Sequence, residues 1–116
     1  MSSHALVQSA LDAHAGLTAL VGQRIRPDLA DPADDMPFVV FKRTRLERHK
    51  GLEGTLLGTT ETFDIECWAA TRAESINVAE QAALALDAAQ LDATEGQPDG
   101  IDPEFLDRVT VLSVSI

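Results

Sequence analysis

Apolar side chains recur at spacings of three and four near the start of the chain, which predicts a short amphipathic helix over residues 3–14. The residues that would share its apolar side are Leu6, Val7, Ala10, Leu11 and His14. Gly16 follows where this helix would end. Residues 17–22 favour one further helical turn, released by Gly22, and a brief extended piece then ends at Pro27.

Two stretches with strand character follow, at residues 37–48 and 60–69. In the first, the alternation would place Val39, Phe41, Arg43 and Arg45 on one face. Both faces change from apolar to polar near residue 42, so we expect this strand to start inside the domain and run out of it. In the second, the expected core side chains alternate with outward ones; they are Phe63, Ile65, Cys67 and Ala69. Residues 49–59 contain three glycines and predict a flexible turn or a hairpin arm.

A long alanine-rich helix is predicted from a capping box at Thr71 and Glu74 to about Leu91. We expect its core stripe to consist of Ile76, Ala79, Ala83 and Leu86, widened by Val78, Ala82, Ala85 and Ala89. Residues 94–104 predict a loop, and residues 105–116 predict a closing strand.

This order of elements favours an α+β fold in one domain of residues 1–116. We expect an antiparallel sheet of three to four strands, with two helices packed on one face and a protruding basic hairpin. A chain of 116 residues is long enough for one hydrophobic core.

Charge is distributed unevenly along the chain, whose formal net charge is −10. Residues 41–50 contain five of the nine Lys and Arg residues and one acid, Glu47. The five basic residues are Lys42, Arg43, Arg45, Arg48 and Lys50. Their segment sums to +4, so the other 106 residues sum to −14. Such a surface repels a polyanion, and we expect no specific nucleic-acid binding.

The pattern of reactive side chains does not favour catalysis, a metal or a cofactor. The acid pairs Asp34–Asp35 and Asp64/Glu66 are better explained as solvated carboxylates. The three histidines lie far apart without ligand spacing, and Cys67, on an apolar strand face, fits an inert core thiol. A lone cysteine predicts no intramolecular disulfide, and no apolar run approaches the ~20 residues that span a bilayer. We therefore expect a protein that is made in the cytosol, without membrane association.

Two features could serve protein contacts. Trp68 lies among acids on the outward face of its strand, where it could anchor a partner or cover its own domain. The basic hairpin could dock on an acidic surface, or its charges could simply protect a sheet edge from aggregation. The residues alone leave both questions open.

Three phrases of the sequence resemble a known family: ALVQSALDAHAGLTALVGQRIRP, MPFVVFKRT and TFDIECWAATRAESINVAEQAALAL. Together they cover about residues 5 to 90 and resemble the small tail completion or tail terminator proteins of long-tailed phages, prophages and gene transfer particles. The resemblance implies a non-catalytic ring, usually of six copies, in the virion tail after assembly in the host cytoplasm. It would close the head-proximal end of the tail tube and join it to the head connector, with DNA passing through its lumen. The connection after the long helix is short, where some members insert a further hairpin strand, which leaves the sheet edge undecided.

A ring suggests where the basic hairpin would bind, because each subunit meets its neighbour through two different patches. The candidate acids on the next copy are Asp28, Asp31, Asp34 and Asp35. A tail tube protein or a connector protein is the other possible partner. The alternative function is a small regulatory module, monomeric or dimeric, that binds an acidic protein through the hairpin.

Overall fold

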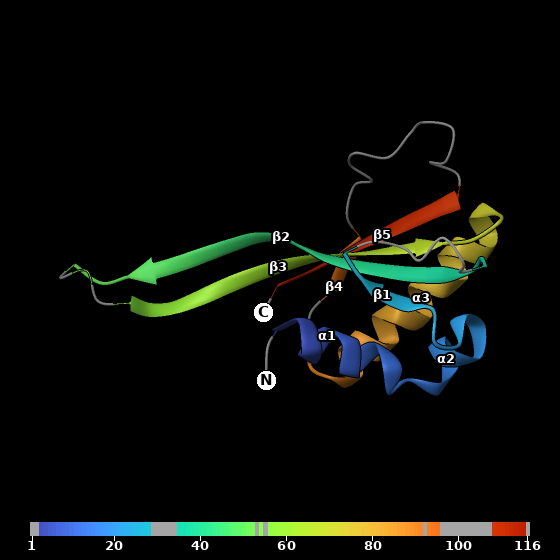
Figure 1. The fold of residues 1–116 in the computed structure, drawn as a ribbon, viewed down its shortest axis with the longest axis horizontal. Coiled ribbons are helices and arrows are strands. Elements are labelled where there is room, and N and C mark those ends of the chain that lie inside the picture. Colours follow the sequence, from blue (N-terminus) through green and yellow to red (C-terminus); the bar gives the residue numbers. More distant parts are fainter. Residues whose placement is uncertain are drawn as a thin grey trace.

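The computed structural model describes residues 3–28, 35–52, 54, 56–91, 93–95 and 108–115. Its helices are α1 (Ser3–Asp12), α2 (Ala15–Val21) and α3 (Arg72–Ala88). Its strands are β1 (Ile25–Pro27), β2 (Phe38–Lys50), β3 (Leu56–Trp68), β4 (Ala93–Glu95) and β5 (Val109–Ser115). The helices lie on one side of the sheet, and β2 and β3 reach far beyond it (Figure 1).

The strands form one mixed sheet in the order β1-β2-β3-β5-β4. β1 runs parallel to β2, and every other neighbouring pair is antiparallel. The α+β class and the helices on one face are confirmed. The prediction of three to four antiparallel strands with two helices was wrong in detail, because the described residues form five strands and three helices. β1 and β4 have three residues each, too few for a period of two to become visible in the sequence.

The first helix ends earlier than predicted. His14 takes an extended conformation between α1 and α2, so the chain turns there and a second helix begins at Ala15. Gly16 therefore lies inside α2 rather than after a helix, and the single predicted turn is a helix of seven residues with Leu17 and Val21 buried. Gly22 ends α2 as expected, with φ 59°, and its N–H donates to the Thr18 carbonyl at 2.8 Å.

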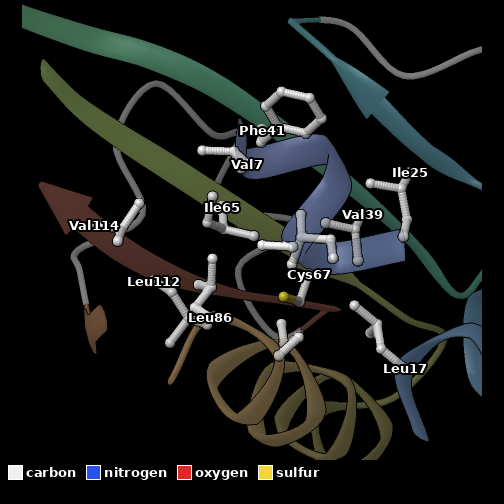
Figure 2. Close-up of a cluster of buried hydrophobic side chains, with 14 of the residues drawn as sticks. Val7, Leu17, Ile25, Val39, Phe41, Ile65, Cys67, Leu86, Leu112 and Val114 are labelled. Atoms are coloured by element: carbon white, nitrogen blue, oxygen red, sulfur yellow. The ribbon is translucent and has the colours of Figure 1, made fainter. Parts of the chain in front are cut away.

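The core lies between the helices and the facing side of the sheet (Figure 2). Phe63, Ile65 and Cys67 of β3 are fully buried there, which confirms the predicted alternation of that strand. Their cross-strand neighbours Phe41 and Leu112 continue the same face on β2 and β5. The alanines of α3 that belong to this core are Ala79, Ala82 and Ala85.

Helix α3 begins as predicted, because the Thr71 side chain accepts a hydrogen bond from the Glu74 N–H at 3.2 Å. It ends at Ala88, earlier than the predicted Leu91. Its buried residues are Ser75, Val78, Ala79, Ala82, Ala85 and Leu86. Ile76 was wrongly placed in the core stripe: it is 41% exposed. A helix advances about 100° per residue, so a stripe that includes Ser75 and Val78 turns Ile76 away from the sheet.

Ser75 is a polar residue that the sequence pattern missed. Its hydroxyl lies 2.9 Å from the Arg72 carbonyl and 3.0 Å from the Thr110 hydroxyl, so this buried group is satisfied and links α3 to β5.

Beyond α3, β4 pairs with β5 and forms the edge of the sheet. Thr94 and Glu95, predicted as loop, belong to this strand, so a short extra strand is present where the sequence left the edge undecided. Residues 96–104 of the predicted loop lie outside the described residues.

Candidate docking hairpin

β2 and β3 both extend beyond their other neighbours in the sheet. β1 pairs with β2 only as far as Phe41, and β5 pairs with β3 only as far as Thr62. From Arg45 onward β3 is the one neighbour of β2 in the described part of the chain, and the two continue as a ribbon (Figure 1). We call residues 45–61 the projecting hairpin. The prediction of a strand that leaves the domain is confirmed.

The projecting hairpin gives the molecule an elongated shape, with extents of 51 × 31 × 24 Å. The radius of gyration is 14.9 Å, whereas a compact chain of this length is expected near about 13 Å. A two-stranded hairpin without a further packing surface is only marginally stable in water. Neither edge of the ribbon is paired with a further strand among the described residues.

A bulge at Thr44 determines which side chains lie on which face of the hairpin. Arg43 is opposite Phe63, but Arg45 is opposite Thr62, so Thr44 is an additional residue in β2. Its hydroxyl donates to the Thr62 carbonyl at 3.3 Å. Arg45 therefore shares the face of Thr62, and the prediction that it shares a face with Arg43 was wrong. The simple alternation of a strand cannot show a bulge.

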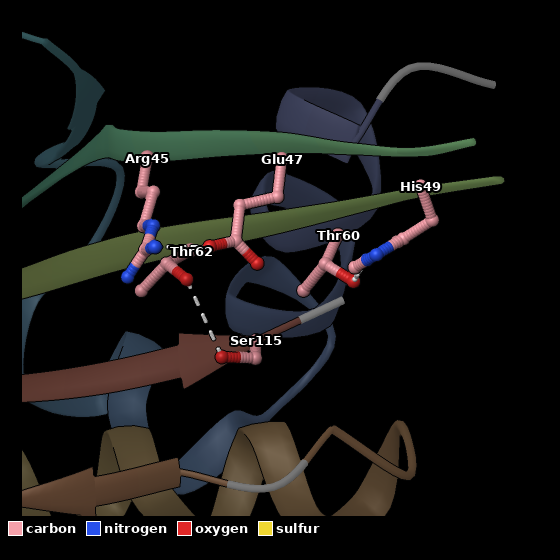
Figure 3. Close-up of polar contacts among 6 residues, drawn as sticks. All are labelled: Arg45, Glu47, His49, Thr60, Thr62 and Ser115. Atoms are coloured by element: carbon pink, nitrogen blue, oxygen red, sulfur yellow. Dashed lines mark hydrogen bonds and ion pairs between the residues drawn. The ribbon is translucent and has the colours of Figure 1, made fainter. Parts of the chain in front are cut away.

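One face of the hairpin is polar, and its side chains pair with each other (Figure 3). Arg45 forms an ion pair with Glu47 two residues later. His49 Nε2 lies 2.7 Å from the Thr60 hydroxyl. At the base of the hairpin, the Thr62 and Ser115 hydroxyls are 3.4 Å apart. These contacts occupy polar groups of this face that would otherwise be available to a partner.

The opposite face is different in character. Leu46 lies opposite Glu61 and is 41% exposed, and Arg48 lies opposite Thr59. At the base of this face, Arg43 reaches Glu61 at 3.8 Å. Arg48 and Lys50 are exposed, and neither forms an ion pair with another described residue. The sequence analysis did not select Leu46; its signal was a lone apolar residue among Arg and Glu.

The excess positive charge of residues 41–50 is offset by acids that the hairpin brings close to them. Lys42 binds Glu66 at 2.8 Å, inside the sheet rather than on the projecting hairpin. Residues 42–66 contain five Lys or Arg and five Asp or Glu, so their formal sum is zero. The sequence interpretation of a strongly cationic arm needs correction, because β3 brings acids beside the cations of β2. Arg48 and Lys50 are the cations without an ion partner among the described residues of the hairpin.

Trp68 packs within its own domain. Its ring stacks on Phe38 at 6.1 Å, and its Nε1 donates to Glu66 at 3.1 Å. This arrangement agrees with a covering role on the outer face, beside the buried Val40. A contact of Trp68 with another subunit stays a prediction.

The predicted acidic loop is described only in part. Asp31 and Asp34 lie outside the described residues, and Asp35 is exposed before the start of β2. Asp35 and Arg48 are separated by most of β2, roughly 40 Å of strand. They can therefore meet only between two copies of the chain.

Cys67, the candidate thiol of the sequence analysis, is buried in the core. Burial, and secondarily the negative charge of Glu66, raises the pKa of the Cys67 thiol from 9.0 to about 12, which confirms the inert thiol. Among residues 3–28, 35–52, 56–91 and the other described segments, no three His, Cys, Asp or Glu are grouped to hold a metal ion. No helix among them is long and apolar enough to cross a membrane.

Comparison with known proteins identifies the family. The structure is similar to the solved structure of the gp17 protein of bacteriophage SPP1, with a TM-score of 0.57 and 18% sequence identity. The match covers 98% of this chain and 90% of the phage protein, which shows a shared fold. No curated protein matches the sequence significantly. The family model for tail completion protein gp17, however, matches residues 5–113. The chain therefore belongs to the tail completion protein gp17 family.

Proposed function

We propose that the protein forms a ring of six copies that closes the head-proximal end of a phage tail tube and joins it to the head connector. Its role there is structural, without catalysis. Its partners are further copies of itself, the tail tube protein and the connector protein, and DNA passes through the ring. Copies made in the host cytoplasm assemble into the virion tail. Membership of the gp17 family supports this proposal.

The observation that carries the proposal is the projecting hairpin. Among the described residues it has no packing partner beyond Arg45 and Thr62, yet it carries an exposed Leu46 and two cations without ion partners. In a ring with heterologous contacts, every hairpin binds the next subunit, and the rotation between neighbouring subunits closes the ring. Binding to a neighbour would supply the packing surface that a two-stranded ribbon lacks.

Mass measurement tests the ring. Wild-type protein should give a discrete species of six copies, about 74 kDa from the 12.4 kDa chain, by sedimentation velocity at high concentration or on purified tail tubes. The matched control replaces residues 48–59 by Asn-Gly, which joins the facing pair Glu47 and Thr60 through a two-residue turn. This variant should stay folded, because the hairpin lies outside the core, and it should remain monomeric.

A wild-type protein that stays monomeric even with tail tubes would contradict the proposal. Binding of such a monomer to an acidic protein through the hairpin would instead favour the regulatory module.

A further inference from the structure

The outward side of α3 carries a second exposed surface that combines apolar and acidic residues. Ile76 and Leu84 are 41% and 51% exposed. Glu80 and Asp87 fall on the same stripe of the helix, since residues three or four apart are neighbours on a helix surface. Neither acid forms an ion pair with another described residue. The stripe has no cation of its own between Glu74 and Ala88.

A groove of about 280 Å³ lies beside this stripe, between α3 and β5. The residues that line it are Ile76, Ala79, Glu80, Ala83, Thr110 and Leu112. Glu80 is the ionisable group in this lining, and most of the other side chains are apolar. A single exposed leucine or isoleucine is ordinary on a protein surface. Here the exposed Ile76 lies at a groove and beside the Glu80 carboxylate, and this arrangement suits the binding of a partner protein.

The open face of the projecting hairpin complements this groove. It presents Leu46 and, two residues later, Arg48, which are about 7 Å apart along the strand. Ile76 and Glu80 are separated by about 6 Å along the helix. An apolar residue and a charge thus lie about 6 to 7 Å apart on both surfaces, and the charges are opposite.

We propose that the groove beside α3 of one copy receives the Leu46 and Arg48 face of the hairpin from the next copy. Leu46 packs against Ile76 at the groove, and Arg48 pairs with Glu80. This inference rests on the proposed ring and names its contact surfaces. It assigns the hairpin to α3 rather than to the loop that contains Asp35, because exposed Asp35 offers a charge whereas the groove offers both a charge and an apolar surface.

Disulfide trapping tests the contact directly. A Leu46→Cys, Ile76→Cys double variant should give a ladder of covalent oligomers up to six copies under mild oxidation. Each single variant should give no ladder. Buried Cys67 can stay in place, because its thiol is inaccessible. A Leu46→Cys, Asp35→Cys variant is the competing arrangement, and a ladder from this pair alone would overturn the inference.

Charge reversal gives a test that does not depend on disulfide geometry. Arg48→Glu should raise the protein concentration at half assembly about tenfold or more, and Glu80→Arg in the same chain should restore it to within about threefold. Arg45→Glu is the matched control, because Arg45 lies on the other face. It should change assembly by less than about threefold. Urea melts of all variants verify that the subunit remains folded.

The outcomes separate this inference from the proposed function. If the wild type forms rings and Arg48→Glu assembles equally well, the α3 contact is wrong and the ring stands. The same conclusion follows if Asp35→Arg, but not Glu80→Arg, restores the assembly of Arg48→Glu. A wild-type chain that never forms a ring would contradict both the proposed ring and the α3 contact.

Discussion

At the scale of single residues, Glu66 shows how the sheet tolerates a charge on a largely buried position. One carboxylate oxygen binds Lys42 at 2.8 Å, and the other accepts from Trp68 at 3.1 Å. A buried charge is strongly unfavourable unless it is paired and hydrogen-bonded. The acid, the lysine and the tryptophan thus form one unit on the outer face. The sequence analysis had treated them separately, as a solvated acid, a cation of the basic hairpin, and a tryptophan that could anchor a partner or cover its own domain.

The difference between a buried and an exposed isoleucine is the first prediction. Ile65→Ala should lower the free energy of unfolding by ~2 to 5 kcal/mol, because it leaves a cavity in a fully buried site. Ile76→Ala makes the same chemical change at a position that is 41% exposed and should cost under about 1 kcal/mol. Urea denaturation measures both in the monomer. Equal losses would mean that the orientation of β3 or of α3 described above is wrong.

Cys67 should make stability depend on alkaline pH. The unfolded thiol ionises near its ordinary pKa of 9.0, whereas burial holds the folded thiol protonated until about 12. The folded state binds more protons in this window, so the free energy of unfolding should fall as the pH rises from about 9 towards 12. Cys67→Ala removes this contribution and leaves the other ionisable side chains, including both lysines, unchanged. Urea melts should therefore show a steeper alkaline loss in the wild type. Parallel curves for the two proteins would exclude a thiol protected in the folded state.

At the scale of elements, β2 and β3 have two distinct parts. Their inner halves belong to a five-stranded sheet with helices on one face. Their outer halves pair with each other and, as far as the chain is described, with no further strand. The bulge at Thr44 lies where these parts meet. Because of this bulge, the self-paired side chains Arg45 and Glu47 lie on one face of the hairpin, and Leu46 and Arg48 lie on the other.

Amide hydrogen exchange should reveal these two parts. In the monomer, amides of residues 46–49 and 57–60 should exchange much faster than those of residues 63–67, because the outer ribbon opens without breaking the core. Assembly should slow exchange in the outer segments at least about tenfold and leave the inner ones unchanged. Equal protection of both parts in a proven monomer would contradict this division. The Asn-Gly variant is the control for assignment of the outer peptides.

At the scale of the whole molecule, the formal net charge of −10 opposes assembly of like copies. The projecting hairpin does not carry a large positive charge against this repulsion, because residues 45–61 contain three Lys or Arg and three Glu. In the proposed ring, specific contacts would have to overcome this repulsion, and a combined apolar and ionic contact serves better than charge alone. This is the physical ground for assigning the hairpin to the groove beside α3.

The sequence by itself determined the features that depend on local periodicity. The core face of β3, the cap of α3 at Thr71, the turn at Gly22 and the exit of β2 from the domain each follow from a few neighbouring residues. The same local phrases carried the family resemblance, which the match over residues 5–113 confirms.

The tertiary structure decided what depends on residues distant in the chain. Acids on β3 lie beside cations on β2 only after the two strands pair, so a count over residues 41–50 alone overstated the charge of the hairpin. The bulge at Thr44 arises from pairing as well, and it reversed the expected face of Arg45. Ile76 turned outward because packing against the sheet selected a neighbouring stripe of a helix that has alanines on several sides. In each case the energy lies in contacts between elements, and a linear pattern does not record those contacts.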